Sequence, residues 1–189
     1  MPQARFYRRL PLSVVEQVDD AGALRVVSVD DAGAAGALTL LPTTSFDLLD
    51  GAAPELLPEG RRIASPRIWE ARGLLLRPGA GVAGIGRALT EIALAVNDIG
   101  RALGLTHVVA VYDAATHRWA GRLGHAGAPL GPAQRLHGYE LLAAVYELGG
   151  AFDAHVRAAA AAAGVRFDPP TLRPDALRGW TTFTQARRS

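Results

Sequence analysis

The sequence has no cysteine among its 189 residues. This absence excludes a disulfide scaffold, a zinc site built on thiolates and a cysteine nucleophile. Five histidines are present, but no two of them lie three or four residues apart. The sequence therefore shows no pair of metal ligands on one helix face, and we expect no metal site.

The chain also lacks a dominant charge and a long apolar run. Twenty basic and eighteen acidic residues give a formal charge of +2, which is too balanced to indicate a nucleic-acid partner. No segment approaches the roughly 18 uncharged apolar residues needed to span a membrane. The N-terminus lacks the apolar segment of a signal peptide. We expect a cytoplasmic protein with neither a nucleic-acid nor a membrane partner.

The composition is instead that of a folded protein. Hydrophobic residues make up 49% of the chain and charged residues only 20%, the reverse of the balance in disordered chains. We expect one domain over residues 1–150, followed by a helix and tail over residues 151–189. Asp168-Pro169-Pro170 breaks regular structure in that tail.

Hydrophobic patterning predicts a mixed order of elements. Turn residues 30–33 join two β-rich segments into a hairpin, and residues 43–60 read as a surface connection with one helical turn near residues 47–50. The predicted elements are strands at 24–29, 37–41, 67–77 and 107–112, helices at 84–103 and 151–163, a helix or turn at 116–123, and a helix or strand at 139–148.

Two of these elements are the most informative. Apolar residues recur at helical spacing from Ile85 to Ile99, and Gly104 follows as a C-terminal cap often does. The continuous apolar run at 107–112 is typical of a central strand buried on both faces. We therefore expect an α/β fold with one mixed central sheet and no regular βαβ repetition.

A glycine-rich segment precedes the long helix. Free N–H groups and the helix dipole favour phosphate oxygens at such a position. The spacing Gly79-x-Gly81-x-x-Gly84 matches a dinucleotide fingerprint by letter, but it falls in mid-chain after a hairpin and a third strand. No Gly-Lys-Ser/Thr follows, so a Walker loop is excluded.

A better match to this segment is the pyrophosphate loop of the GCN5-related N-acetyltransferases. Gly84-Ile85-Gly86-Arg87 resembles the second half of that loop, whereas the expected basic or amide residue is Gly81. The resemblance implies that Gly84, Gly86 and Arg87 bind coenzyme A. A glycine-rich turn that merely starts a helix is the alternative.

Further segments narrow the resemblance to acyl-homoserine-lactone synthases. Leu40-Leu41-Pro42-Thr43 resembles their Leu-Leu-Pro-Thr, Trp69-Glu70 their Trp-Glu strand, and residues 107–112 their fifth strand. Residues 126–138 resemble their Leu-Gly-Pro segment, and the match covers roughly residues 16–148.

This resemblance implies a GCN5-related fold, with a splayed central sheet flanked by helices and a V-shaped gap between two parallel strands. An acyl thioester of acyl carrier protein or coenzyme A would be one substrate and S-adenosylmethionine the other, with no permanent cofactor. Acyl carrier protein is therefore a candidate partner. Arg118, Arg122 and Arg135 could meet its acidic surface through complementary charge, and a solvated arginine face is the favoured alternative. Acyl length, acceptor and oligomeric state stay open.

The resemblance also implies roles for individual residues. Glu70 would assist removal of the amine proton, although it could instead pair with a nearby arginine. Tyr112 would protonate the leaving thiolate, with Tyr139 and Tyr146 as rivals. The residues expected to contact substrate are Trp69, Arg72, Leu41, Thr43 and Val109.

The sequence departs from the family at several positions. The family's arginine before Leu-Leu-Pro-Thr is Thr39, and its Ser-Arg after Trp-Glu-x is Arg72-Gly73. This places Arg72 one residue early, on the opposite strand face unless a bulge intervenes. Arg5 and Phe6 are the nearest counterparts of the N-terminal lid. These departures leave two alternatives to a lactone-synthase function. One is an ordinary N-acetyltransferase, and the other is a non-catalytic relative that binds a partner or ligand.

Overall fold

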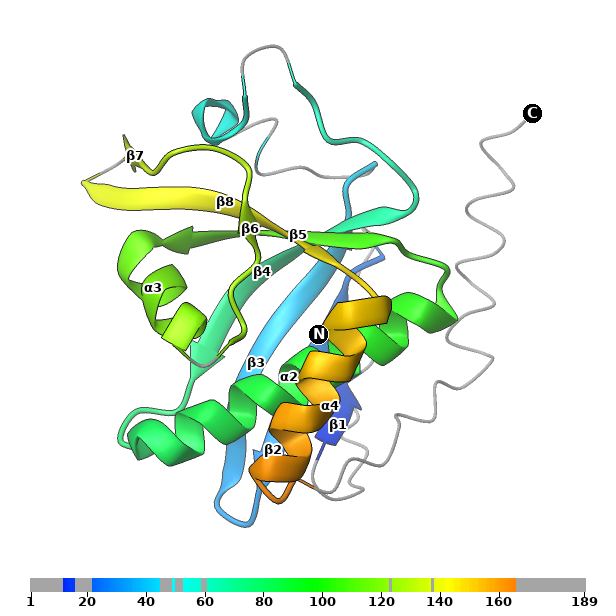
Figure 1. The fold of residues 1–189 in the computed structure, drawn as a ribbon, viewed down its shortest axis with the longest axis vertical. Helices are drawn as coiled ribbons and strands as arrows, with labels where there is room; N and C mark the ends of the chain where they lie inside the picture. Colours follow the sequence, from blue (N-terminus) through cyan, green and yellow to red (C-terminus); the bar gives the residue numbers. More distant parts are fainter. Residues whose placement is uncertain are drawn as a thin grey trace, which may run out of the picture.

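The computed structural model describes residues 22–44, 49, 53–58, 61–122, 124–136 and 138–165, and the backbone of residues 12–15. These form one mixed sheet with helices on it (Figure 1). The strand order is β1-β2-β3-β4-β5-β8-β6, and β7 pairs with β8. The strands are β1 (Leu12–Val15), β2 (Leu24–Asp30), β3 (Gly33–Pro42), β4 (Ile68–Leu76), β5 (His107–Asp113), β6 (Ala128–Pro129), β7 (Gln134–Leu136) and β8 (Tyr139–Glu147), and the helices are η1 (Pro54–Leu56), α2 (Gly81–Ala102), α3 (Ala114–Arg122) and α4 (Gly150–Ala162).

The mixed α/β fold and the predicted hairpin are confirmed. β2 and β3 pair antiparallel around a turn in which Gly33 has a φ of 107°, a conformation that favours glycine. The segment left open as helix or strand is the strand β8, and the segment left open as helix or turn is the helix α3. Arg5, Phe6, the start of the resemblance near residue 16 and the tail beyond residue 165 lie outside the described residues.

The centre of the sheet is splayed. β4 and β5 pair in parallel only where residues 68–71 face residues 107–110. Beyond that point β4 follows β3 to Leu76, while β5 follows β8 to Asp113. A β-bulge accompanies the separation: one extra residue of β4 lies between the Thr39–Arg72 and Ala37–Leu75 pairs, and Gly73 there has a φ of 61°. Bulges bend and twist their strand, so this one turns β4 at the point where it leaves β5.

The helix α2 crosses one face of the sheet diagonally (Figure 1). Its apolar stripe, including Ile92, Val96 and Ile99, packs on Trp69 and Val108 and their neighbours. The helix begins at Gly81, three residues before the predicted start, and Gly104 follows its end with a φ of 69°. The predicted helix and its glycine cap are confirmed, but the start of the helix was placed too late.

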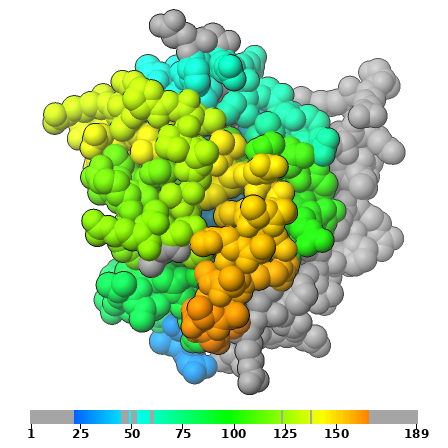
Figure 2. Space-filling model, in the orientation of Figure 1, coloured from blue at the N-terminus to red at the C-terminus, as the bar shows by residue number. Residues whose placement is uncertain are grey.

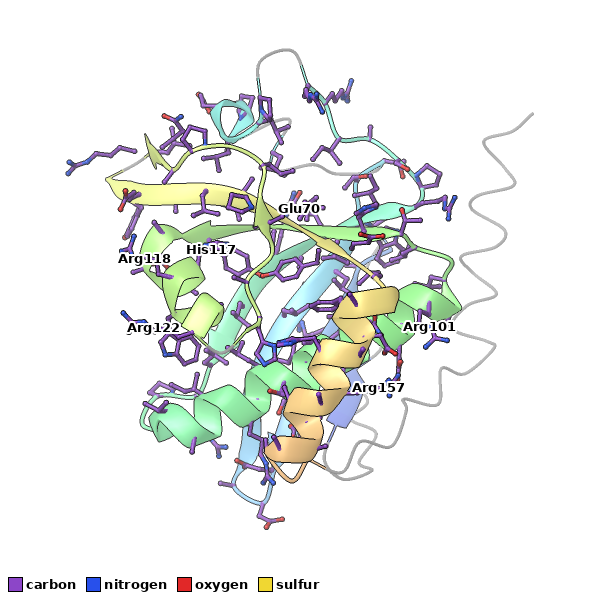
Figure 3. The ribbon with its side chains drawn as sticks, viewed as in Figure 1. Glu70, Arg101, His117, Arg118, Arg122 and Arg157 are labelled. Carbon is purple, nitrogen blue, oxygen red and sulfur yellow. The ribbon has the colours of Figure 1, made fainter. Side chains whose placement is uncertain are left out.

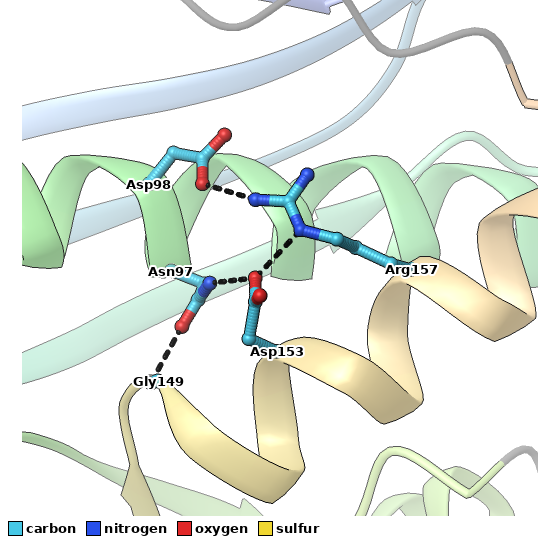
Figure 4. Close-up of polar contacts among 5 residues, drawn as sticks. All are labelled: Asn97, Asp98, Gly149, Asp153 and Arg157. Atoms are coloured by element: carbon cyan, nitrogen blue, oxygen red, sulfur yellow. Dashed lines mark hydrogen bonds and ion pairs between the residues drawn. The ribbon is translucent and has the colours of Figure 1, made fainter.

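The helix α4 packs on α2 through Val156 and Ala160, which contact Leu94. A polar cluster fixes this contact (Figure 4). The side chain of Asn97 accepts a hydrogen bond from the backbone N–H of Gly149 at 2.9 Å and donates to Asp153 at 2.6 Å. Because Gly149 immediately precedes α4, Asn97 satisfies a backbone donor at the start of that helix.

The opposite face of the sheet is covered by the connection before β4. Leu49 is fully buried and Leu56 is 2% exposed, and both belong to a cluster with Val109 of β5 and Ala143 of β8. The expectation that this connection lies on the surface is wrong for these residues. The physical reason is that β5 is apolar on both faces, so its second face also has to be shielded from water. None of the helices in the described ranges is long and apolar enough to cross a membrane.

Candidate functional site

A largely apolar cavity lies where β4 and β5 part. Its volume is about 820 Å³ when the part open to solvent is included. Figure 2 shows a hollow on this face between α4, in orange, and the green and yellow segments around α3 and β8. Its walls come from β3, β4, β5, α2, α3, β8 and α4. The polar side chains in its lining are Arg72, Tyr112, Thr116, His125 and Tyr146.

The cavity enters the gap between the two strands. Val108 and Tyr112 project from one face of β5, and Val111 projects from the other. All three line the cavity. A space in contact with both faces of a strand must reach around that strand's edge, and β5 has a free edge only where β4 has left it. The predicted V-shaped gap is therefore present and open.

Glu70 and Arg72 form an ion pair at this point. The Nε and terminal nitrogen of Arg72 donate to the two carboxylate oxygens of Glu70 at 2.5 and 2.9 Å. The Glu70 side chain is fully buried, whereas that of Arg72 is 19% exposed. Arg72 lines the cavity and Glu70 does not. The two side chains share a strand face because they lie two residues apart, and the bulge comes only after Arg72.

The other expected substrate contacts lie outside the cavity lining. Trp69 is 2% exposed and packs in the core under α2. Leu41 and Val109 flank Glu70 on the neighbouring strands and share its face, away from α2. The hydroxyl of Thr43 donates to the carbonyl oxygen of Ile68 at 2.8 Å and accepts from the N–H of Ser65 at 3.0 Å. Thr43 thus fixes the start of β4.

Tyr112 is the predicted residue that lies most clearly in the cavity. Its hydroxyl accepts a hydrogen bond from the Tyr146 hydroxyl at 3.0 Å. Burial, and then the neighbouring Tyr146, raise the pKa of Tyr112 well above its usual value. Burial also raises the pKa of Tyr146, while hydrogen bonds to Tyr112 and to the backbone of Gly127 oppose that rise. Both phenols are protonated at neutral pH, and the Tyr112 hydrogen is left to be donated elsewhere. The rival Tyr139 is 66% exposed.

The expected coenzyme-binding residues lie in the first turns of α2 rather than in a loop before it. Only the first four N–H groups of a helix are free of intrahelical bonds, so the N–H of Gly86 is not available to phosphate. A Cβ added at Gly86 would meet no heavy atom within 4 Å, which shows open space beside the helix. The Arg87 side chain is 51% exposed and lies 4.0 Å from the carboxylate of Glu91.

One residue that lines the cavity was missed in the sequence. His125 is 8% exposed and lines the cavity, and its Nε2 lies 3.0 Å from the hydroxyl of the buried Thr90. A lone histidine in an irregular segment carries no pattern that would reveal this. His117 on α3, beside the exposed Arg118 and Arg122 (Figure 3), contacts the carbonyl oxygen of Gly127 at 3.0 Å. No group of three or more potential metal ligands occurs in the described ranges.

Comparison with solved structures shows the fold. The chain superposes on BjaI, described as a CoA-dependent acyl-homoserine lactone synthase, with a TM-score of 0.67 and 19% identity over 87% of this chain and 76% of BjaI. For the acyl-homoserine lactone synthase LasI the TM-score is 0.65, with 21% identity over 72% and 70%. For MesI, also described as CoA-dependent, it is 0.61, with 21% identity over 89% and 82%. No protein-family model and no curated protein sequence matches the chain.

The chain therefore has the fold seen in these acyl-homoserine-lactone synthase structures, as the sequence resemblance implied for the fold. At these identities the likeness extends to the fold alone. The chemistry of this chain has to be argued from its own cavity and the side chains around it.

Proposed function

We propose that this protein is an acyltransferase that moves an acyl group from a thioester to an amine. The observation that carries the proposal is the open apolar cavity between the parted ends of β4 and β5. An apolar space bounded by a few polar side chains suits an acyl chain whose reactive carbonyl lies at one end. The residue at that boundary on β4 is Arg72, and on β5 it is Tyr112.

The parted strands also suit the arm that carries the thioester. Within the described strands, ladder pairing between β4 and β5 stops after Ala71 and Ala110. The facing edges beyond that point present backbone groups that an extended, amide-containing arm can pair with, as an added strand would. Coenzyme A and acyl carrier protein both deliver acyl groups on such an arm, and BjaI has been solved with isopentyl-CoA.

One of the cavity side chains can serve the proton transfer to the leaving thiolate. In acyl transfer a C–N bond forms, the C–S bond breaks, the amine loses a proton and the departing thiolate gains one. We assign the protonation of the thiolate to Tyr112, which is half-buried, neutral and supplied with a hydrogen bond by Tyr146. A tyrosine hydroxyl that stays neutral in the cavity can donate a hydrogen bond, and then its proton, to the thiolate that forms beside it, because the apolar surroundings destabilise the thiolate's charge as well.

In the proposed mechanism Glu70 does not contact the substrate but positions Arg72. Both of its oxygens accept from that guanidinium, and its side chain is not part of the cavity wall. Arg72 lines the cavity, and its guanidinium offers a positive charge to an anionic group of a substrate, such as the carboxylate of an amino-acid acceptor. S-adenosylmethionine carries such a carboxylate, and BjaI has been solved with it. We therefore propose it as the first acceptor to test.

Turnover tests the proposal directly. The purified chain would be mixed with acyl-CoA donors of several lengths, or with matching acyl carrier protein thioesters, and with S-adenosylmethionine. Thiol release would be followed with a colorimetric thiol reagent, and the products would be identified by mass spectrometry. The proposal expects thiol release that depends on the amine and a product heavier than the amine by the acyl group. Absence of thiol release with every donor and amine would reject it.

One observation favours a second candidate, a relative that binds the thioester without turnover. Glu70, which the resemblance makes the proton acceptor, is fully buried and held by Arg72 outside the cavity. Saturable binding of acyl-CoA, together with no thiol release under any condition, would favour this candidate over the acyltransferase.

A further inference from the structure

His117 ties the helix α3 to the short strand β6. Its Nε2 lies 3.0 Å from the carbonyl oxygen of Gly127, the residue before β6. A carbonyl oxygen only accepts hydrogen bonds, so Nε2 of His117 carries the hydrogen and donates it. The strand β6 has only two residues, both paired with β8. So short a strand fixes its own position weakly, and His117 adds an anchor from a second element.

Gly127 lies directly against the ring of Tyr146. A Cβ added at Gly127 would lie 2.8 Å from Cε2 of that ring and 2.8 Å from the carbonyl oxygen of Val145, so a larger residue would push the ring or the strand aside. The backbone of Gly127 also forms a hydrogen bond with the Tyr146 hydroxyl, and that hydroxyl donates to Tyr112 at 3.0 Å. A run of contacts therefore leads from His117 through Gly127 to the two tyrosines.

The His117 ring also lies beside the ring of Tyr112. The centroids of these two rings are 6.4 Å apart, and those of Tyr112 and Tyr146 are 6.5 Å apart. Both tyrosines line the cavity, whereas His117 does not. His117 can therefore influence the reacting atoms through the tyrosines but not by contact with a substrate.

Resting on the proposed function, we infer that His117 is a positioning residue for the acid of the acyl transfer. By holding the Gly127 carbonyl, it keeps the Tyr146 hydroxyl directed at the oxygen of Tyr112. That oxygen already accepts a hydrogen bond, so the O–H of Tyr112 is left to point at the thiolate.

The proton balance of this step closes within the reaction. As the C–S bond breaks, the thiolate takes the proton of Tyr112, and the tyrosinate that remains keeps the hydrogen bond from Tyr146, which stabilises its negative charge. The proton that the amine loses then restores the phenol through solvent. His117 gains and loses no proton in this step.

The test compares two leaving groups within one protein. An alkyl thiolate is basic and gains from a proton as it leaves, whereas a more acidic aryl thiol leaves as a stable thiolate without one. With the amine that supports turnover, kcat/KM would be measured for the octanoyl thioesters of N-acetylcysteamine, an alkyl thiol, and of para-nitrothiophenol, an aryl thiol. The alkyl-to-aryl ratio of the two values reports acid assistance, and a general loss of folded protein cancels from it.

Two variants of His117 separate positioning from a structural role. His117→Leu removes the donor to Gly127, whereas His117→Gln keeps an N–H near the position of Nε2. We expect the alkyl-to-aryl ratio to fall about threefold in His117→Leu, as it should in Tyr146→Phe, and to stay unchanged in His117→Gln. The double variant that combines His117→Leu with Tyr146→Phe should also show a fall of about threefold, because both changes remove the same hydrogen bond to Tyr112.

Two results would overturn the inference about His117. One is an unchanged alkyl-to-aryl ratio in His117→Leu. The other is a fall of about ninefold in the double variant, which would mean that His117 and Tyr146 act independently. Either result leaves the acyl transfer standing, because the unaltered protein still turns over both thioesters. Absence of turnover in the unaltered protein would instead overturn the proposed function and this inference together.

Discussion

Arg72 holds the carboxylate of Glu70 with two nitrogens of its guanidinium, at 2.5 and 2.9 Å, at the point where β4 leaves β5. Across the sheet, Arg72 is paired with Thr39, the position at which the lactone-synthase pattern has an arginine. Cross-strand partners share a face of the sheet. The guanidinium of Arg72 therefore lies beside Thr39, which is uncharged where the lactone-synthase pattern has an arginine. Arg72 is itself held by the buried carboxylate of Glu70.

This pairing predicts a large and asymmetric loss of stability. Arg72→Met leaves Glu70 as a buried charge without its main partner and should lower the free energy of unfolding by about 3 kcal/mol. Replacing both residues, with Glu70→Leu added to Arg72→Met, should lower it by less than Arg72→Met alone. Urea unfolding of both variants and of the unaltered protein measures this. Equal losses in the single and double variants would show that the pair is not coupled.

The two tyrosines in the cavity should differ in their effect on turnover. Tyr112→Phe removes the proposed acid and should lower kcat about a hundredfold, with little change in KM for the acyl donor. Tyr146→Phe removes only a supporting hydrogen bond and should lower kcat about threefold. Tyr139→Phe, at an exposed position, is the matched control. Equal activities in Tyr112→Phe and Tyr139→Phe would remove Tyr112 from the mechanism.

Two glycines of α2 should differ in their response to alanine. A Cβ at Gly86 meets no heavy atom within 4 Å, so Gly86→Ala should raise stability by about 1 kcal/mol through helix propensity. A Cβ at Gly100 would lie 2.2 Å from Cδ1 of Leu148, so that side chain has to shift and Gly100→Ala should gain less stability than Gly86→Ala. Thermal unfolding measures both effects.

The Gly86 variant also tests the donor site. If coenzyme A passes close to the start of α2, the added methyl group should weaken its binding severalfold even though the protein is more stable. Unchanged affinity for acyl-CoA in Gly86→Ala would place the coenzyme elsewhere.

Glu91 should make stability depend on pH in a defined direction. This carboxyl accepts a hydrogen bond from Ser28, and burial raises its pKa above the ordinary value of 4.5. Above that ordinary value the unfolded chain is ionised, so the folded protein is destabilised as the pH rises through the raised pKa. Glu91→Gln should therefore be more stable than the unaltered protein at pH 7. The advantage should shrink as the pH falls below the raised pKa. An advantage independent of pH would contradict this assignment.

The cluster that joins α4 to α2 should show the contrast between buried and exposed polar contacts. Asn97 is fully buried and bonded to Gly149 and Asp153, so Asn97→Ala should cost about 2 kcal/mol. Arg157 is 45% exposed, and its ion pairs with Asp98 and Asp153 should be worth about 0.5 kcal/mol. A loss in Arg157→Ala as large as that in Asn97→Ala would show that the ion pairs, not Asn97, hold the helix.

Much of the fold was predictable because its patterns are local. The apolar stripe of α2, the glycine after it and the continuous apolar run of β5 each depend on neighbouring residues, and all three are confirmed. The burial of Leu49 and Leu56 was not predictable, because a connection rich in proline and acidic residues shows no periodicity. What buries these leucines is the second face of β5, a contact between distant parts of the chain.

The site was predictable only in part, for a related reason. Motif resemblance identified Glu70 and Tyr112, but it could not show that Glu70 turns away from the cavity while Arg72 enters its wall. Both side chains lie on one strand face, and the outcome depends on where β5 parts from β4: Glu70 lies within the paired part, whereas Arg72 lies just beyond the last pair, at the gap. His125 lies beside Thr90 only because the segment after α3 folds back onto α2, which no spacing in the sequence reveals.

The crystal structure of the protein with octanoyl-CoA tests the central claim most directly. The account predicts that the acyl chain lies in the cavity, with its thioester in the gap between Arg72 and Tyr112 and its pantetheine arm along the parted edges of β4 and β5. A structure in which β4 and β5 pair along their whole length, or in which the acyl chain binds outside the gap, would contradict it.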